Sequence, residues 1–405
     1  MTIVVLESLT FGLRRLVDAA SELGERLCLL TQDPGFYHHE LASIAEDRLD
    51  VVVVDTFDRD AVHKAIAALP GVRGLISSTD TWAVAGAELA EEFGLPGLAA
   101  ERVRLARDKF AVRNLLWEKG LSSGRAERVA VAELDIEWLS RTTGLPAVVK
   151  DSAGTGSRNV WLVRDSSDLS VVRAEAEAAT LSGTLFAEPF LRGPVYSAET
   201  LTWRGHTRLL GVSSRLMSPP PKFVESVTAF PVAFPQHQRA ELSAWIGQVL
   251  AAVGYTDRFA HVEFAMTATG PEVIEINPRI GGAQVAESMC RALGYNVYRA
   301  AVQLALGERP ELIGIELPGG PAVAFTLSYP EEAGVFAEVS GLSQLGELPG
   351  APEWLPTKQP GVLIEHLGDH RGCVGMVLAE AETAELAVHR VTAAAGTLRV
   401  RTSAL

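Results

Sequence analysis

The chain has 405 residues, 47% of them hydrophobic, and a formal net charge of −14 at pH 7. This length and apolar content predict a globular protein with two to four structural units and well-filled cores. The excess of acidic residues disfavours nucleic acid and anionic membranes as partners, because both attract clustered Lys and Arg.

Cysteine usage and the first residues indicate a cytoplasmic protein. Only Cys28, Cys290 and Cys373 occur, so neither a disulfide framework nor a cysteine metal site is expected. The segment Met1–Leu6 lacks the cationic start and the long apolar stretch of a signal peptide. No run approaches the roughly 18 uncharged residues that a membrane-spanning helix needs.

Residues 1–97 alternate short apolar runs with amphipathic stretches. Strands are expected at 3–6, 27–30, 51–54 and 74–77, and helices at 11–23, 60–69 and 82–93, with a further helix at 100–119. Such alternation is typical of a parallel sheet covered by helices on both faces. The loops lack a full Gly-x-Gly-x-x-Gly motif, so a dinucleotide site is not supported.

A glycine-containing loop follows the expected strand at 146–150. This strand ends at Lys150, and the loop 151–157 holds Gly154 and Gly156 beside hydroxyl side chains. Glycines let backbone amides approach an anion, and a lysine adds a compact positive charge, which favours a phosphate cradle. It is not a P-loop, which requires Gly-Lys-Ser/Thr at a helix start, and a plain surface turn is the alternative.

The most informative pattern lies in the segment 259–282. Its two arms alternate apolar and polar residues around a short corner, which predicts a β-hairpin. On the second arm we expect Ile274 and Ile276 in the core, while Glu275 and Asn277 point to the other face.

Two acids in this hairpin are expected to face each other. If the loop holds three residues, Glu263 pairs opposite Glu275, and facing like charges are destabilising unless a cation lies between them. Two carboxylates and the amide oxygen of Asn277 suit Mg²⁺, which prefers oxygen ligands. Arg279 follows on the same face, where a cation could meet a transferring phosphoryl group. The alternative is a surface hairpin with solvated acids.

These residues carry a family resemblance. Glu263, followed by the run Glu275-Ile-Asn277-Pro-Arg279-Ile-Gly281-Gly282, resembles the metal-binding signature of the ATP-grasp superfamily of carboxylate-amine ligases. The resemblance implies an α/β fold, α+β in part, with ATP and Mg²⁺, or Mn²⁺ in its place, as cofactors. The implied units are an N-terminal parallel-sheet domain at 1–97, a linker helix region at 98–124, a small lid unit at 125–190, a central unit with the metal site at 191–309, and a strand-rich C-terminal cap at 310–405.

The same resemblance assigns roles to residues outside the hairpin. The phosphates would be held by two lysines and by the glycine-containing loop that follows the second of them: Lys109, Lys150, Ser152, Gly154, Thr155, Gly156 and Ser157. The segment 186–194 resembles the hinge that binds adenine, through Glu188, Pro189, Phe190 and Leu191. Many relatives carry an acid for the ribose where this chain has Val195, and Glu199 is an open candidate to compensate.

The stretch 215–234 is similar to a segment that borders the amino-acid pocket in bacterial L-amino-acid ligases. Glu225 matches an acid that pairs with a substrate ammonium group, and Thr228 stands where relatives often present a histidine. Gln284 is expected either to shape the same pocket or to cap the next helix. His261 is either a group behind the metal ligands or a structural histidine.

The implied function is ATP-dependent joining of an amino-acid-like carboxylate to an amine through an acyl phosphate. Arg279 and the backbone amides of Gly281 and Gly282 would stabilise the acyl phosphate and the tetrahedral adduct. Both substrates are small molecules, and a homodimer is the further partner considered. The alternatives are a carboxylase that uses bicarbonate and a nucleotide-binding protein that has lost turnover.

Overall fold

The N-terminal unit is a parallel sheet with helices on both faces, as the sequence predicts. The computed structural model describes residues 1–156, 158–218, 223–367 and 370–403. The strands of this unit, in the order β3-β2-β1-β4, are β1 (Thr2–Leu6), β2 (Arg26–Thr31), β3 (Leu49–Val53) and β4 (Val72–Ile76). Its helices are α1 (Leu13–Glu22), the short η1 (Pro34–Tyr37) and α2 (His38–Leu41), α3 (Arg59–Ala68) and α4 (Ala83–Glu92). Alternate strand residues pack on α1 or on α3 and α4, so both faces are buried.

The linker region differs from the single helix that the sequence predicts. It consists of α5 (Ala100–Arg107) and α6 (Lys109–Glu118). Asp108 between them has an extended backbone, and its side chain accepts a hydrogen bond of 3.0 Å from the backbone N–H of Ala111. An aspartate at the N-cap accepts a hydrogen bond from a backbone N–H that has no partner within its helix. Asp108 therefore starts α6 and interrupts the single helix expected for this region.

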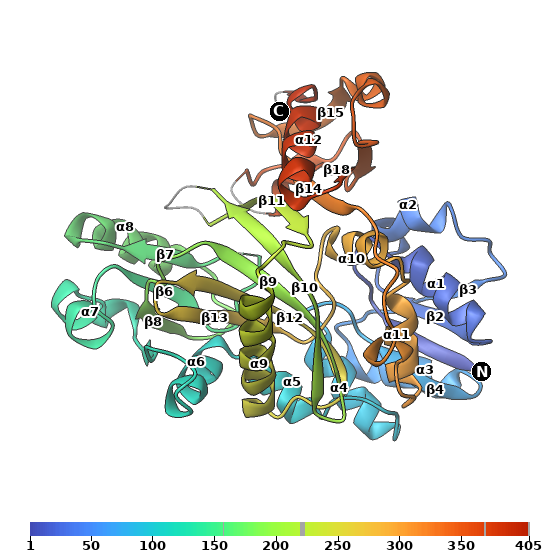
Figure 1. Cartoon of the computed structure of the whole chain (residues 1–405), viewed down its shortest axis with the longest axis horizontal. Coiled ribbons are helices and arrows are strands. Elements are labelled where there is room, and N and C mark those ends of the chain that lie inside the picture. The colour runs from blue at the N-terminus through green and yellow to red at the C-terminus, as the bar shows by residue number, and fades with distance from the viewer. Residues whose placement is uncertain (157, 219–222, 368–369, 404–405) are drawn as a thin grey trace.

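A small antiparallel unit follows. Its strands, in the order β5-β8-β6-β7, are β5 (Glu127–Arg128), β6 (Ala147–Asp151), β7 (Val160–Val163) and β8 (Leu185–Pro189). Its helices are η2 (Val131–Glu133), α7 (Ile136–Thr142) and α8 (Ser166–Ala178). Figure 1 shows it in green, at the end of the molecule away from the N-terminal unit. Ser157, one of the expected phosphate-binding residues, lies outside the described residues.

An eight-stranded sheet forms the centre, in the order β13-β12-β9-β10-β11-β14-β18-β16. Its strands are β9 (Val195–Trp203), β10 (His206–Met217), β11 (Glu225–Phe230), β12 (Arg258–Thr267), β13 (Gly270–Asn277), β14 (Ala322–Ser328), β16 (Glu353–Pro356) and β18 (Gly375–Ala381). Its helices are α9 (Gln236–Ala252), α10 (Val285–Leu293) and α11 (Tyr298–Ala305), with the 3₁₀ turn η3 (Glu311–Ile313). The sheet continues past residue 309, because β11 pairs with β14.

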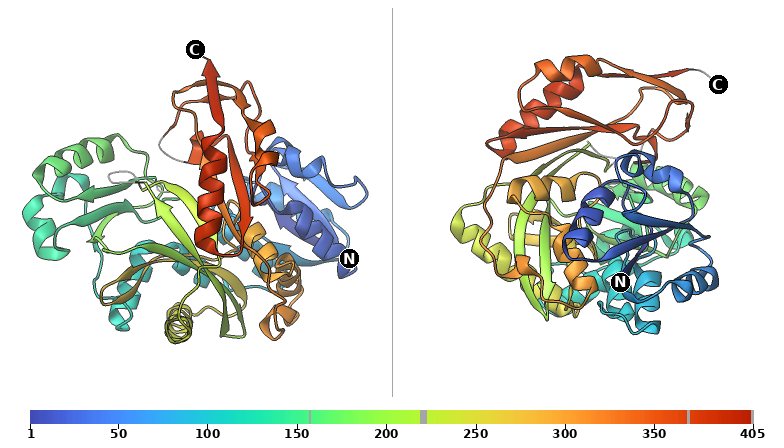
Figure 2. Two further views of the ribbon diagram at one scale, coloured as in Figure 1. Left: turned by 45° about the horizontal axis from the view of Figure 1, so that its top comes forward. Right: turned by 90° about the vertical axis from the view of Figure 1, so that its right-hand side faces the viewer.

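The last segment adds a smaller sheet above the centre of the molecule, as Figures 1 and 2 show. Its strands, in the order β17-β15-β19, are β15 (Gly334–Ser340), β17 (Leu363–Ile364) and β19 (Arg399–Ser403). Here α12 (Ala384–Gly396) packs a face of small residues on β14 and β18, and two 3₁₀ turns lie at η4 (Leu342–Glu347) and η5 (His370–Gly372). Within the described ranges, no helix is both long and apolar enough to cross a membrane.

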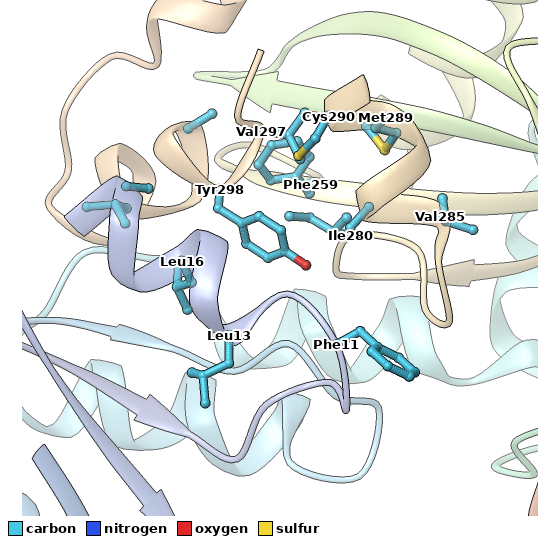
Figure 3. Packing of buried hydrophobic residues seen from close by; sticks show 14 of the residues in the cluster. Phe11, Leu13, Leu16, Phe259, Ile280, Val285, Met289, Cys290, Val297 and Tyr298 are labelled. Atoms are coloured by element: carbon cyan, nitrogen blue, oxygen red, sulfur yellow. The ribbon is translucent and has the colours of Figure 1, made fainter. Parts of the chain in front are cut away.

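A buried cluster fixes the N-terminal unit against the centre. Leu13 and Leu16 of α1 pack with Tyr298 of α11 in one core, and Figure 3 shows the Tyr298 ring reaching toward the start of α1. Gly12 permits this approach, because a Cβ there would lie 1.8 Å from the Tyr298 hydroxyl oxygen. Its φ of +97° also favours glycine. The carboxyl ends of β1 and β4 are therefore held beside the segment that follows β13.

Candidate active site

The hairpin has the expected facing acids. Glu263 of β12 pairs with Glu275 of β13, and His261 pairs with Asn277. The loop holds two residues, 268 and 269, one fewer than the three on which the expected pairing is based. A register shift between Glu263 and Phe264 compensates, so the two carboxylates still lie opposite each other.

This register shift corrects the expectation for Ile274. Val273 and Ile276 are the buried core residues of β13, whereas Ile274 is half-buried and lines a cavity together with Glu275. A bulge places two successive residues on one side of a strand, so strict alternation fails at this point.

Protein cations hold each of the expected metal-binding groups. Arg215 Nη2 lies 3.2 Å from Glu263 Oε1, and Lys109 Nζ lies 2.9 Å from Glu275 Oε2. Arg107 donates to Asn277 Oδ1 at 3.2 Å. Burial by itself would raise the pKa of Glu275, but Lys109 and the hydrogen bond from Asn277 hold it well below its usual range.

The donor set fits a hard divalent cation. Among the described residues there is no group of three or more His, Cys, Asp or Glu side chains with metal-site geometry. Glu263 and Glu275 do face each other across the ladder, and the amide nitrogen of Asn277 donates a hydrogen bond of 2.8 Å to Glu275 Oε1. Such a set of two carboxylates and an amide matches Mg²⁺ held partly by phosphate oxygens, which does not need a complete protein cage.

A cavity of about 190 Å³ opens beside the hairpin, between the small unit and the central sheet. Most of the expected nucleotide residues line it: Lys109, Lys150, Gly154, Gly156, Glu188, Pro189, Phe190, Leu191, Glu263 and Glu275. Ser152 and Thr155 do not line it. The Ser152 hydroxyl accepts a hydrogen bond from the Thr184 N–H, and the Thr155 carbonyl accepts one from the Arg158 N–H.

A buried ion-pair group forms one end of this cavity. Glu188 lies 2.5 Å from Lys150 Nζ and 2.9 Å from Arg113 Nε, and all three residues are buried. Although burial raises the pKa of Glu188, Arg113 and Lys150 lower it overall, so the carboxylate is ionised. The Glu188 side chain therefore holds Lys150 at the cavity wall.

Part of the cavity wall is apolar. Val148, Val160, Met217 and Ile274 line it together with Val195, which suits a flat aromatic base. Glu199 does not compensate for Val195, because its carboxylate is buried and hydrogen-bonded to Ser197, Ser213 and His261. Periodicity along β13 alone could not place Ile274 here, because the bulge changes its side.

Beyond the expected metal-binding residues lies Arg279. Its guanidinium is held by Asp80 of the N-terminal unit, with Nε 3.0 Å from Oδ1 and Nη2 2.5 Å from Oδ2. Gly281 has no space for a side chain, since a Cβ would lie 2.5 Å from Val285 Cγ1 and 2.9 Å from His261 Nδ1. Gly282 is less crowded, and a Cβ there would be 3.7 Å from Arg279 Nη1.

Arg215 connects the face of the expected metal ligands with the expected amino-acid pocket. It contacts Glu225 Oε2 at 2.9 Å and His261 Nε2 at 3.1 Å, and the Thr228 hydroxyl donates to the other oxygen of Glu225. Burial lowers the pKa of His261, but Glu199 outweighs it and raises the pKa to about 9. His261 therefore lies behind Glu263 and Arg215 as a supporting group held by Glu199.

Gln284 does not share the pocket of Glu225. It lines a separate cavity of about 550 Å³ between α1, α2 and α10, together with Phe11 and Arg14. It occupies the N-cap position of α10 without a side-chain capping hydrogen bond. The segment that follows Gly282 turns toward the N-terminal unit, which takes Gln284 away from β11.

Sequence reasoning missed three cationic or acidic residues of the site: Asp80, Arg107 and Arg215. Each comes from a different element, and their partners are up to 199 residues away in sequence. Arg107 directly precedes the helix break at Asp108, and the single helix expected from the sequence gave no signal for its position.

Three family models match successive parts of the chain. An ATP-grasp N-terminal domain matches residues 17–97, an ATP-grasp domain matches 143–287, and an L-amino acid ligase C-terminal domain 2 matches 327–403. With the fold and the facing acids described above, the chain is an ATP-grasp protein. Its C-terminal segment is of the kind found in L-amino acid ligases.

Curated relatives cover the chain to different extents. It is 26% identical over 390 residues to the uncharacterized protein y4rH of Sinorhizobium fredii, covering 94% of this chain and 78% of the relative. It is 25% identical over 319 residues to carnosine synthase 1 of Homo sapiens, covering 73% of this chain. The match spans only 38% of that synthase.

Solved structures share the whole fold. The L-amino acid ligase from Bacillus licheniformis has a TM-score of 0.82 at 20% identity, covering 99% of this chain and 98% of that one. The biotin carboxylase domain of the 2-oxoglutarate carboxylase from Hydrogenobacter thermophilus has a TM-score of 0.75 at 18% identity, covering 99% and 90%. That domain was crystallised with MgADP and bicarbonate. ATP with Mg²⁺ is thus the cofactor pair of this class.

Proposed function

We propose that this protein joins an amino acid, or a similar carboxylic acid, to an amine with the hydrolysis of ATP to ADP and phosphate. The observation that carries this proposal is the pair of facing acids, Glu263 and Glu275, at the wall of a cavity that also presents Lys109 and Lys150. Similarity to proteins named L-amino acid ligase and carnosine synthase supports the same reaction class.

The first step activates the acid. A carboxylate oxygen attacks the γ-phosphorus of ATP, the bond from that phosphorus to the β-phosphate oxygen breaks, and ADP leaves with the electron pair. Glu263, Glu275 and Asn277 would hold Mg²⁺, or Mn²⁺, which when bound neutralises charge on the phosphates. Lys109 and Lys150 hold the phosphates of the nucleotide at the cavity wall.

The second step forms the amide. The amine nitrogen attacks the acyl carbon, the C–N bond forms, and the C–O bond to phosphate breaks so that phosphate leaves with the electron pair. The attacking neutral amine loses one proton, which the departing phosphate accepts. Arg279, with the backbone amides of Gly281 and Gly282, stabilises the negative oxygen of the adduct.

Glu225 is proposed to bind the ammonium group of the acid substrate. Its oxygens already accept hydrogen bonds from Arg215 and from the Thr228 hydroxyl. A carboxylate offers about four acceptor positions, so Glu225 still has capacity for a substrate N–H. Arg215, which contacts both Glu225 and Glu263, would orient the carboxylic acid substrate beside Glu263.

The test is phosphate release from ATP with a panel of amino acids as acids and amines, combined with mass detection of amide products. We expect turnover that depends on both an acid and divalent metal. Hydroxylamine added in place of the amine should intercept the acyl phosphate and give a hydroxamate. Background release throughout would contradict the proposal, and release that requires bicarbonate would support the carboxylase alternative.

A further inference from the structure

Asp80 lies where a parallel sheet presents functional groups. It belongs to the loop between β4 and α4, at the carboxyl end of β4. Ligand-binding residues of open α/β sheets collect at the carboxyl ends of strands. The side chain leaves its own unit and meets Arg279, which is 199 residues later in the chain.

The contact between Asp80 and Arg279 fixes the plane of the guanidinium. Two parallel hydrogen bonds, of 3.0 and 2.5 Å, join the carboxylate to Nε and Nη2, and Nη1 donates to the Ile280 carbonyl at 3.1 Å. Such a bidentate pair restrains both distance and orientation, which a single point charge does not. The exposed fractions of the two side chains are 17% and 12%, so water competes little.

Asp80 also separates two cations. Arg107 Nη1 lies 3.2 Å from Asp80 Oδ1 and 3.2 Å from Asn277 Oδ1. Without the carboxylate, Arg107 and Arg279 would be neighbouring buried guanidinium groups with no shared counter-ion. Arg279 would then turn toward the remaining acids of the site, which are Glu263 and Glu275.

A second clamp holds the same two backbone segments together. The buried guanidinium of Arg258 donates to the Ser77 carbonyl at 2.9 Å and to the Pro278 carbonyl. Ser77 begins the loop of Asp80, and Pro278 immediately precedes Arg279. On the other side, Ile280 packs in the cluster with Phe259 and Tyr298, as Figure 3 shows. The backbones of both partners are therefore fixed, and the direction of Arg279 is set by its bonds to Asp80 and to the Ile280 carbonyl.

We propose that Asp80 is a positioning residue that aims the Arg279 guanidinium at the reacting phosphate and acyl oxygens, so that the N-terminal domain takes part in catalysis. This inference rests on the proposed function. Asp80 acts through Arg279 and needs no contact of its own with either substrate. The N-terminal unit is then a component of the active site and not only a cover for it.

The experiment measures kcat and KM for ATP in wild type, Asp80→Asn, Arg279→Lys and the double variant, on the full chain with acid, amine and Mg²⁺. We expect Asp80→Asn to lower kcat about 100-fold while KM for ATP changes less than about threefold, because orientation affects the reacting state more than nucleotide binding. If Asp80 works through Arg279, the double variant should be no slower than Arg279→Lys alone.

Two further variants separate positioning from folding. Asp80→Glu keeps the charge and hence the neutrality of the arginine pair, but moves the carboxylate by one methylene, and should still lower kcat about tenfold. Asp18→Asn removes another carboxylate of the N-terminal unit, paired with Arg48 at 2.8 Å, and should leave kcat unchanged.

The outcomes distinguish this inference from the proposed function. If wild type shows no acid-dependent turnover, both are overturned. If wild type turns over and Asp80→Asn keeps its kcat, only the role of Asp80 is overturned. The same holds if the kcat losses of Asp80→Asn and Arg279→Lys multiply in the double variant.

Discussion

At the scale of single residues, the site is neutralised by its own side chains. Lys109 forms an ion pair with Glu275, Arg215 forms one with Glu263, and Arg107 donates a hydrogen bond to Asn277. Opposite charges at these distances stabilise each other strongly in a partly buried place. A metal ion that arrives alone must displace these cations, whereas nucleotide phosphates offer them new anionic partners.

We therefore predict that Mg²⁺ binds only together with nucleotide. Calorimetry of the protein with MgCl₂ alone should give little heat, and titration with ADP in the presence of Mg²⁺ should give a clear binding isotherm. The reason is that Lys109 can move from Glu275 to a phosphate as the metal enters. Tight uptake of Mg²⁺ by the nucleotide-free protein would show this order to be wrong.

We also predict that Glu275→Gln abolishes turnover without unfolding the protein. The substitution keeps the size of the side chain but removes one of the two facing carboxylates, so metal-linked nucleotide binding should weaken. Phosphate release and circular dichroism measure the two effects. The control Glu241→Gln, at an exposed position of α9, should behave as wild type. Unchanged activity of Glu275→Gln would show that Glu275 is not a metal ligand.

At the scale of elements, the break between α5 and α6 determines which side chains reach the cavity. Because Asp108 ends one helix and caps the next, Arg107 and Lys109 both contact the polar face of β13. Lys109 also donates to the Gly154 carbonyl at 2.5 Å, so α6 touches the glycine loop as well as the hairpin. A continuous helix would carry residues two apart to different sides.

Asp108→Ala should show the importance of this break. Loss of the cap is expected to lower the free energy of unfolding by about 1 kcal/mol and to raise KM for ATP, because Lys109 is the first residue of α6. Urea unfolding and steady-state kinetics measure the two effects. Asp58→Ala removes the equivalent cap of α3 and is the matched control, with a similar loss of stability and an unchanged KM. Equal KM values for the two variants would contradict the role given to α6.

At the scale of the whole molecule, one ionic network joins three units. Glu287 of α10 accepts hydrogen bonds from Arg15 of the N-terminal unit, at 2.5 and 2.7 Å, and from Arg291, at 2.7 Å. Arg291 continues to Glu353 at 2.7 Å and to Glu380 at 2.9 Å, on strands near the C-terminus. The network therefore helps to hold the N-terminal unit in the place where Asp80 meets Arg279.

This network predicts a pH-dependent contribution to stability. Burial raises the pKa of Glu287, but hydrogen bonds from Arg15 and Arg291 outweigh it, and the folded-state pKa lies below its usual value. A lowered pKa stabilises the fold at pH values above about 4.3, the unfolded value for Glu, and this contribution is lost as pH falls through the folded pKa. Glu287→Gln should therefore cost about 1–2 kcal/mol at pH 7, allowing for partial solvent screening.

Urea unfolding of wild type and Glu287→Gln at pH 7, 5 and 3 measures this contribution. The difference between them should be largest at pH 7 and 5 and should shrink at pH 3, because the carboxyl group of the unfolded chain is protonated below about 4.3. A difference that stays constant over this range would mean that Glu287 stabilises the fold by packing and not by charge.

The sequence by itself determined the features that depend on local spacing. The parallel N-terminal sheet, the hairpin of β12 and β13, and the strand that carries Lys150 follow from alternation and turn residues over short stretches. Short-range periodicity fixes the face that a side chain takes, and these features need no more than that. The bulge at Ile274 could not be predicted in this way. An extra residue in one strand shows only when that strand is paired with its partner.

Only the tertiary structure decided which side chains meet across units. The bond from Asp80 to Arg279 and the cavity that takes Gln284 away from Glu225 arise where separate units dock. Arg215 meets Glu263 because β9 lies between β10 and β12 in the central sheet. Docking depends on the packing of α1 against α11 and on the order of strands in the sheets. Spacing along the chain does not encode these contacts, because the partners are brought together by burial of apolar surface far from either residue.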